Sequence, residues 1–172
     1  MNFIKRTSFF VVLSIILAFA FAVSANAQTN YEILSGAALT KVVPKSFYFA
    51  GQSAETQMRN TAAAKIGTDR FILAGMVDTS GYSAEISGKY EGFFITDSPV
   101  KIGDKTLETG AYGFGFTAGG HIKFFDLSSK EILSVATQSD ADMKRPRPLQ
   151  MSSEAKGVRF YKGKNYVLVA PN

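Results

Sequence analysis

The chain has 172 residues, 19 of them basic and 14 acidic, and a formal net charge of +5. It contains no cysteine, which excludes disulfide scaffolds, thiol nucleophiles, cysteine-ligated zinc and iron–sulfur clusters. Its single histidine excludes the usual histidine-rich metal sites. The length is typical of one domain with a core of its own. We therefore predict no metal and no cofactor.

The N-terminus has the three parts of a secretory signal peptide. Lys5 and Arg6 precede an apolar run over residues 9–23, and Ala25-Asn26-Ala27 follows with small residues at the cleavage positions. We expect cleavage after Ala27 and an extracytoplasmic location, in the periplasm or secreted. A retained membrane anchor is the alternative, since the apolar stretch approaches the roughly 20 residues that span a bilayer. Removal of Lys5 and Arg6 lowers the net charge from +5 to +3, which is too small an excess to indicate a nucleic-acid partner.

We divide the remaining chain into an N-terminal segment, residues 28–44, and a β-rich domain, residues 45–172. The first segment could form a short helix over residues 31–43. In the second, short apolar runs alternate with turn residues about every 8–12 positions, which is typical of an antiparallel fold. Strands are expected over residues 57–66, 70–77, 89–96, 100–102, 106–107, 111–116, 121–125, 131–137, 157–161 and 165–170.

These runs predict an all-β, mainly antiparallel domain, a single β-barrel or β-sandwich of about nine or ten short strands. Around residues 53–66 a helix with Ser53 as its N-cap competes with the strand. We favour the strand because exposed Gln57, Arg59, Thr61 and Lys65 alternate with apolar neighbours. An outer-membrane barrel needs strands of about 9–11 residues, and most runs here are shorter. We therefore expect no membrane-spanning part after cleavage.

Residues 111–116 place three aromatic side chains on one face of a strand and only Ala and Gly on the other. Tyr112, Phe114 and Phe116 form the aromatic face. The bare face would let another backbone or a ligand approach closely. Together with Tyr82, these rings could line a barrel that holds a small apolar ligand. The alternative is that the rings are the packed core of a sandwich.

The polar candidates are Asp78, Arg59 and His121. Asp78 begins Asp-Thr-Ser-Gly, similar to the aspartic-protease loop, but that chemistry needs two such carboxylates and the sequence has no second motif. A Ser–His–Asp site around His121 would need a nucleophile, and no Gly-x-Ser-x-Gly occurs. The simpler interpretations are an Asp that caps a turn and an exposed turn histidine. We assign no catalytic residue.

Two charged segments remain. Asp140-Ala141-Asp142 lacks the glycine and the final glutamate of a calcium loop. Residues 144–148, Lys-Arg-Pro-Arg-Pro, form the densest basic run, which could hold an anionic ligand or polymer. Its two prolines also suit a solvated connection that leads into an edge strand.

The segment Val100 to Phe116 resembles a hairpin of small secreted β-rich domains, with Gly103, Leu107, Gly110 and Tyr112 at its turns and strand starts. Such domains form uncharacterised families of environmental Gram-negative bacteria. The blocks 48–54 and 77–83 are similar to segments of the same proteins. The resemblance implies a β-rich exported domain and assigns no catalytic residue.

Three hypotheses for function follow. The first is a non-enzymatic exported domain that binds a small apolar ligand through Tyr82, Tyr112, Phe114 and Phe116. The second is a structural or interaction protein of the envelope that contacts a protein or polymer. The third is a hydrolase, which would require Asp78 and His121 to converge within hydrogen-bond reach.

Overall fold

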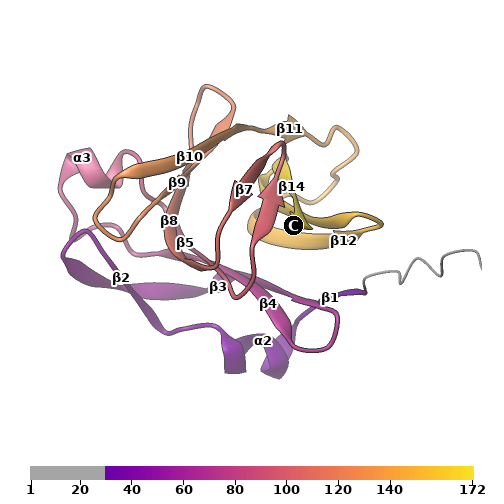
Figure 1. The fold of residues 1–172 in the computed structure, drawn as a ribbon. Helices are drawn as coiled ribbons and strands as arrows, with labels where there is room; N and C mark the ends of the chain where they lie inside the picture. The colour runs from indigo at the N-terminus through magenta and orange to yellow at the C-terminus, as the bar shows by residue number, and fades with distance from the viewer. Residues whose placement is uncertain (1–29) are drawn as a thin grey trace, which may run out of the picture.

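The structure is a computed structural model and describes residues 30–172. The predicted signal peptide lies outside these residues, and its cleavage stays a prediction. Residues 30–172 form two antiparallel sheets and two short helices, with no closed barrel among them (Figure 1). The predicted all-β, antiparallel fold is thus confirmed, in its sandwich form. Neither helix of the described part is long and apolar enough to cross a membrane.

The first sheet has eight strands and curves around one side of the second (Figure 1). Its order is β1 (Tyr31–Ile33), β3 (Gln52–Ile66), β4 (Arg70–Val77), β5 (Gly92–Thr96), β8 (Gly110–Phe116), β9 (His121–Phe125) and β10 (Glu131–Ala136), with β2 (Ser46–Phe49) paired to β3. The second sheet follows the order β12 (Arg147–Glu154), β13 (Gly157–Gly163), β14 (Asn165–Pro171), β6 (Val100–Ile102) and β7 (Lys105–Leu107), with β11 (Gln138–Ser139) paired to β14.

The N-terminal segment contains both a strand and a helix. β1 pairs with the end of β3, so that Tyr31 lies opposite Ile66. Helix α2 (Gly36–Val42) follows, and α3 (Ala84–Ser87) forms later in the chain, where Ser83 caps it by accepting a hydrogen bond from the Ile86 N–H. Through β1, this segment is hydrogen-bonded into the first sheet.

Strand β3 is longer and less regular than its sequence predicts. The helix alternative is excluded, since residues 52–66 are one strand. The expectation that Thr61 is exposed is wrong: only 9% of it is accessible. The register shifts between Thr56 and Thr61, and this bulge interrupts the strict alternation.

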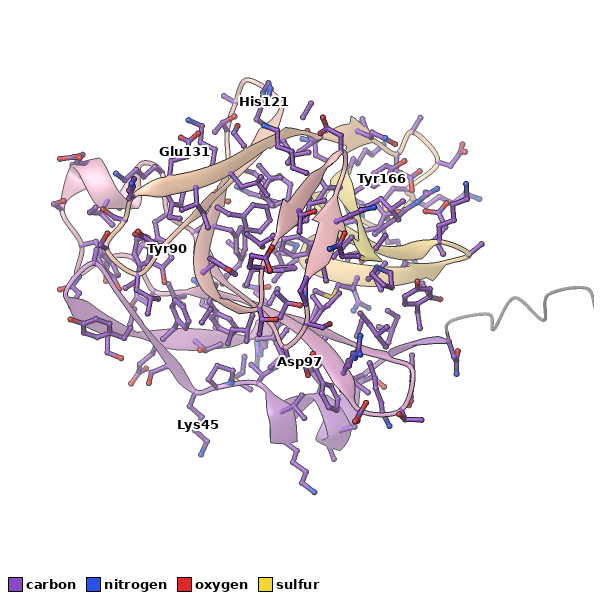
Figure 2. The ribbon with its side chains drawn as sticks, in the orientation of Figure 1. Lys45, Tyr90, Asp97, His121, Glu131 and Tyr166 are labelled. Atoms are coloured by element: carbon purple, nitrogen blue, oxygen red, sulfur yellow. The ribbon has the colours of Figure 1, made fainter. Side chains whose placement is uncertain are left out.

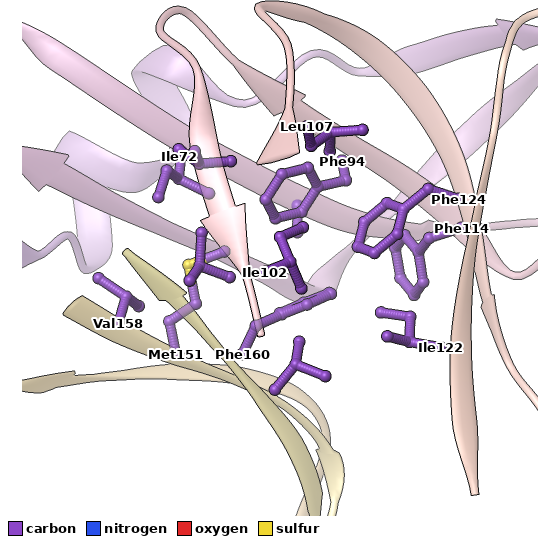
Figure 3. Packing of buried hydrophobic residues seen from close by; sticks show 14 of the residues in the cluster. Ile72, Phe94, Ile102, Leu107, Phe114, Ile122, Phe124, Met151, Val158 and Phe160 are labelled. Atoms are coloured by element: carbon purple, nitrogen blue, oxygen red, sulfur yellow. The ribbon is translucent and has the colours of Figure 1, made fainter. Parts of the chain in front are cut away.

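The main core lies between the two sheets. Phe94, Phe114, Phe124 and Phe160 meet there, each fully buried (Figure 3). The ring centroids of Phe94 and Phe124 are 5.3 Å apart, and those of Phe114 and Phe160 are 5.2 Å apart. In both pairs the edge of one ring packs against the face of the other, which is a favourable aromatic arrangement at these distances.

A second cluster covers the outer face of the first sheet, where β2 and the segment before β5 pack over it. Phe49 stacks on Tyr90, with ring centroids 3.9 Å apart, and both are fully buried. The ring of Phe49 lies against Gly113, where a Cβ would come within 2.4 Å of it. The bare face of β8 is therefore filled by the protein itself.

Candidate functional site

A groove of about 600 Å³ lies at one end of the sandwich. We call it the basic groove, and its lining residues are Phe116, Thr117, Ala118, Pro146, Arg147, Pro148, Lys162, Gly163, Lys164 and Asn165. One wall comes from the β8–β9 turn of the first sheet, and the rest comes from β12 and the β13–β14 hairpin of the second. Part of the predicted basic run and one predicted aromatic residue thus lie in the same site.

Backbone pairing explains how these distant segments meet. Gly163, at φ +61°, allows the tight turn that places Lys162 and Lys164 on either side of it. Arg147 is the first residue of β12 and pairs with Gly163 across the ladder. This pairing therefore holds Arg147 beside Lys162 and Lys164.

The cations of the basic groove differ in their partners. Lys162 forms an ion pair with Glu91, and its Nζ lies 5.9 Å from the centre of the Phe116 ring. Within residues 30–172 neither Arg147 nor Lys164 forms an ion pair, and both are exposed. Lys144 and Arg145, just before the groove, are exposed as well. The groove therefore offers at least two uncompensated positive charges.

The predicted aromatic residues are divided between core and groove. Phe114 is fully buried in the main core, while Phe116 is half-buried and lines the basic groove. The hydroxyl of Tyr112 donates to the Glu108 carbonyl at 2.9 Å, and partial burial raises the pKa of this tyrosine. Tyr82 lies elsewhere, so the structure does not bring these four rings into one site.

Tyr82 and Asp78 share a second hollow of about 250 Å³, formed by residues 52–55, 78 and 80–82. The Tyr82 hydroxyl donates to the Gln52 carbonyl at 3.2 Å, and burial raises its pKa. The Asp78 carboxylate accepts the Ser80 N–H at 3.0 Å, and this bond lowers the pKa of Asp78. Asp78 is thus the cap of its own turn.

The other two polar candidates lie apart from Asp78. Arg59 is exposed on the bulged part of β3, and His121 begins β9, at the upper edge of Figure 2. Asp78 follows β4, and three strand spacings of about 4.8 Å separate β4 from β9, or roughly 14 Å. The Nδ1 atom of His121 lies 3.0 Å from the Gly119 carbonyl instead. Asp78 and His121 therefore do not form an acid–base pair.

Sequence reasoning missed a polar network on the outer face of the second sheet. The guanidinium of Arg159 donates to both carboxylate oxygens of Glu154, at 2.8 and 2.7 Å, and these bonds hold the pKa of Glu154 below its usual value. It also lies 4.7 Å from the centre of the Tyr166 ring. The alternation along β13 could have indicated this outward position, because Arg159 stands between Val158 and Phe160, which face the core.

Nearby, Asp140 accepts a hydrogen bond from the Tyr161 hydroxyl at 3.0 Å. Among residues 30–172 no group of three or more histidine or acidic side chains is placed to hold a metal ion. No protein-family model, curated protein or solved structure matches the chain.

Proposed function

We propose that the protein is an exported, non-enzymatic binding domain that holds an anionic component of the cell envelope in its basic groove. The observation that carries this proposal is the position of Arg147 and Lys164, two cations without a counter-ion among the described residues, beside Phe116. A concave surface lined by one sign of charge raises the local concentration of oppositely charged ligands.

The basic groove supports the proposal better than the aromatic interior does. A small apolar ligand between the sheets would have to displace rings that pack on one another, such as Phe114 on Phe160 at 5.2 Å. The basic groove is already open to solvent. Its occupant would be held by charged hydrogen bonds, and Arg147 can bind two oxygens of one phosphate or carboxylate at once.

The proposed export rests on the leader. Lys5, Arg6, the apolar run and Ala25-Asn26-Ala27 are together the parts that a signal peptidase requires. N-terminal sequencing of the protein from a bacterial host should begin at Gln28. A chain that retains residues 1–27 would contradict this half of the proposal.

The binding half is tested by calorimetric titration with dextran sulfate, a linear polyanion. We expect saturable binding that weakens about 100-fold or more in Arg147→Gln/Lys164→Gln, since each of the two lost charged contacts accounts for roughly 1.5–3 kcal/mol. The matched control is Arg70→Gln/Lys101→Gln, which removes the same two charge types from exposed positions outside the groove. Equal losses in both variants, or no binding by the unchanged protein, would overturn the proposal.

A further inference from the structure

Glu91 connects the two walls of the basic groove. One carboxylate oxygen, Oε2, accepts the Phe116 N–H of the first sheet at 3.0 Å. The other, Oε1, pairs with the Lys162 ammonium of the second sheet. Only 23% of the Glu91 side chain and 34% of the Lys162 side chain are exposed, so solvent screens this pair incompletely.

The backbone around Glu91 determines this position. The Glu91 N–H donates to the Phe114 carbonyl at 2.8 Å, and the Glu91 carbonyl accepts the Val77 N–H at 3.1 Å. This close approach requires glycine at position 115, because a Cβ there would lie 1.9 Å from the Lys89 carbonyl oxygen. These contacts fix the Glu91 backbone against the end of β8, which limits how far the Glu91 carboxylate can move away from Lys162.

The consequence is that one of the three cations that line the basic groove is already neutralised. Arg147, Lys162 and Lys164 carry three charges, and Glu91 reduces their sum to +2. We infer that Glu91 is an internal competitor for Lys162 and thereby determines which anions the basic groove accepts. This inference rests on the proposed function.

The same arrangement indicates the class of ligand. A ligand with a single carboxylate that replaced Glu91 at Lys162 would exchange one negative charge for another and gain little. A ligand with several closely spaced charges can bind Arg147 and Lys164 and compete for Lys162 as well. Ligands in which phosphate or sulfate groups place several negative charges close together are thus favoured over single carboxylates.

The test is titration of pyrophosphate and acetate into protein purified after expression of the full chain. Glu91→Gln removes the charge but keeps an oxygen that can accept the Phe116 N–H. We expect this variant to bind pyrophosphate about ten-fold more tightly, and its preference for pyrophosphate over acetate to narrow. Adding Lys162→Met to Glu91→Gln should abolish this gain, because the double variant returns the net charge of these groove residues from +3 to the +2 of the unchanged protein.

The outcomes separate the inference from the proposed function. If the unchanged protein binds pyrophosphate and Glu91→Gln binds no more tightly, the function stands and the inference fails. If only Glu91→Gln binds, the inference stands and the function fails as stated for the unchanged protein. If neither binds, both fail. Should Glu91→Gln not fold, the double variant Glu91→Gln/Lys162→Met and the single variant Lys164→Met decide: the double variant keeps the net charge at +2 and should bind pyrophosphate within about two-fold of the unchanged protein, whereas a loss as large as that of Lys164→Met would overturn the inference.

Discussion

Phe114 and Phe116 stand two residues apart on the same face of β8, yet they belong to different parts of the molecule. Phe114 is fully buried against Phe160 between the sheets. Phe116 also approaches Phe160, at 5.9 Å, but it is half-buried and has Lys162 over its ring. Alternation assigned both rings to one face, and the extent of the second sheet decided which became core and which became part of a site.

The largest effect that this comparison predicts is on stability. Phe114→Ala should lower the free energy of unfolding by about 3–5 kcal/mol, because it leaves a cavity in a close-packed interior. Phe116→Ala should lower it by about 1 kcal/mol, since part of that ring already faces water. Urea unfolding followed by circular dichroism measures both. Equal losses for the two variants would show that Phe116 belongs to the core.

The residue between them tests the other face of β8. Gly115→Ala should destabilise by about 1–3 kcal/mol, because its Cβ would overlap the Lys89 carbonyl oxygen. Gly119→Ala is the matched control: its Cβ would have no heavy atom nearer than 3.8 Å, and we expect a change within about 0.5 kcal/mol. Thermal unfolding of both variants checks this. If Gly115→Ala leaves the stability unchanged, the close approach of residues 89–91 to β8 would be contradicted.

A smaller effect should appear in binding. Phe116→Leu changes one uncharged wall of the basic groove and leaves its cations in place, so we expect only about a two-fold loss of affinity for dextran sulfate. Phe124→Leu, in the main core, should lower stability and leave affinity unchanged. If the interior rings, and not Phe116, formed the binding site, Phe124→Leu would lower the affinity and Phe116→Leu would leave it unchanged.

The smallest effect concerns acid stability, on the outer face of the second sheet. Bonds from Arg159 lower the pKa of Glu154 from its usual 4.5. A lowered folded-state pKa gives stability that is complete above the unfolded value and is lost as the pH falls through the folded one. The unfolding free energy should therefore decline below about pH 4.5, and Arg159→Met should make that decline shallower.

The control for this measurement is Arg59→Met, which removes an exposed arginine that forms no ion pair within residues 30–172. Because 37% of the Glu154 side chain is exposed, solvent weakens the pair and the difference should be small. An identical acid profile for all three proteins would show that the Arg159–Glu154 pair does not contribute.

Several elements follow from local sequence alone. β4 and β9 begin and end where the sequence predicts, at Arg70–Val77 and His121–Phe125. Gly67 precedes the first and Gly120 the second, each with a positive φ that its turn requires. Alternation and turn chemistry depend on only a few neighbouring residues, and so they can be recognised from the sequence without a structure. β1 and β11, of three and two residues, were not predicted, because each forms by pairing with a strand far along the chain, β3 and β14.

The candidate site was only partly predictable. Sequence singled out the basic run and Phe116 as separate features, and it grouped Phe116 with Phe114 and Tyr82. It had no signal for Lys162, Lys164 or Glu91, because these residues gain their role from partners far along the chain. Arg147 meets Gly163 through a strand ladder, and Glu91 meets Lys162 across two sheets.

By itself, then, the sequence determined the all-β class, most strand positions and the aromatic face of β8, since periodicity and turn residues are local properties. Tertiary structure alone decided that the bare face of β8 is filled by Phe49 and the Lys89 carbonyl. It also decided that Phe116 lines a groove together with cations from β12 and the β13–β14 hairpin. The physical reason is that burial and ion pairing depend on which surfaces meet, and that is settled only when the two sheets pack.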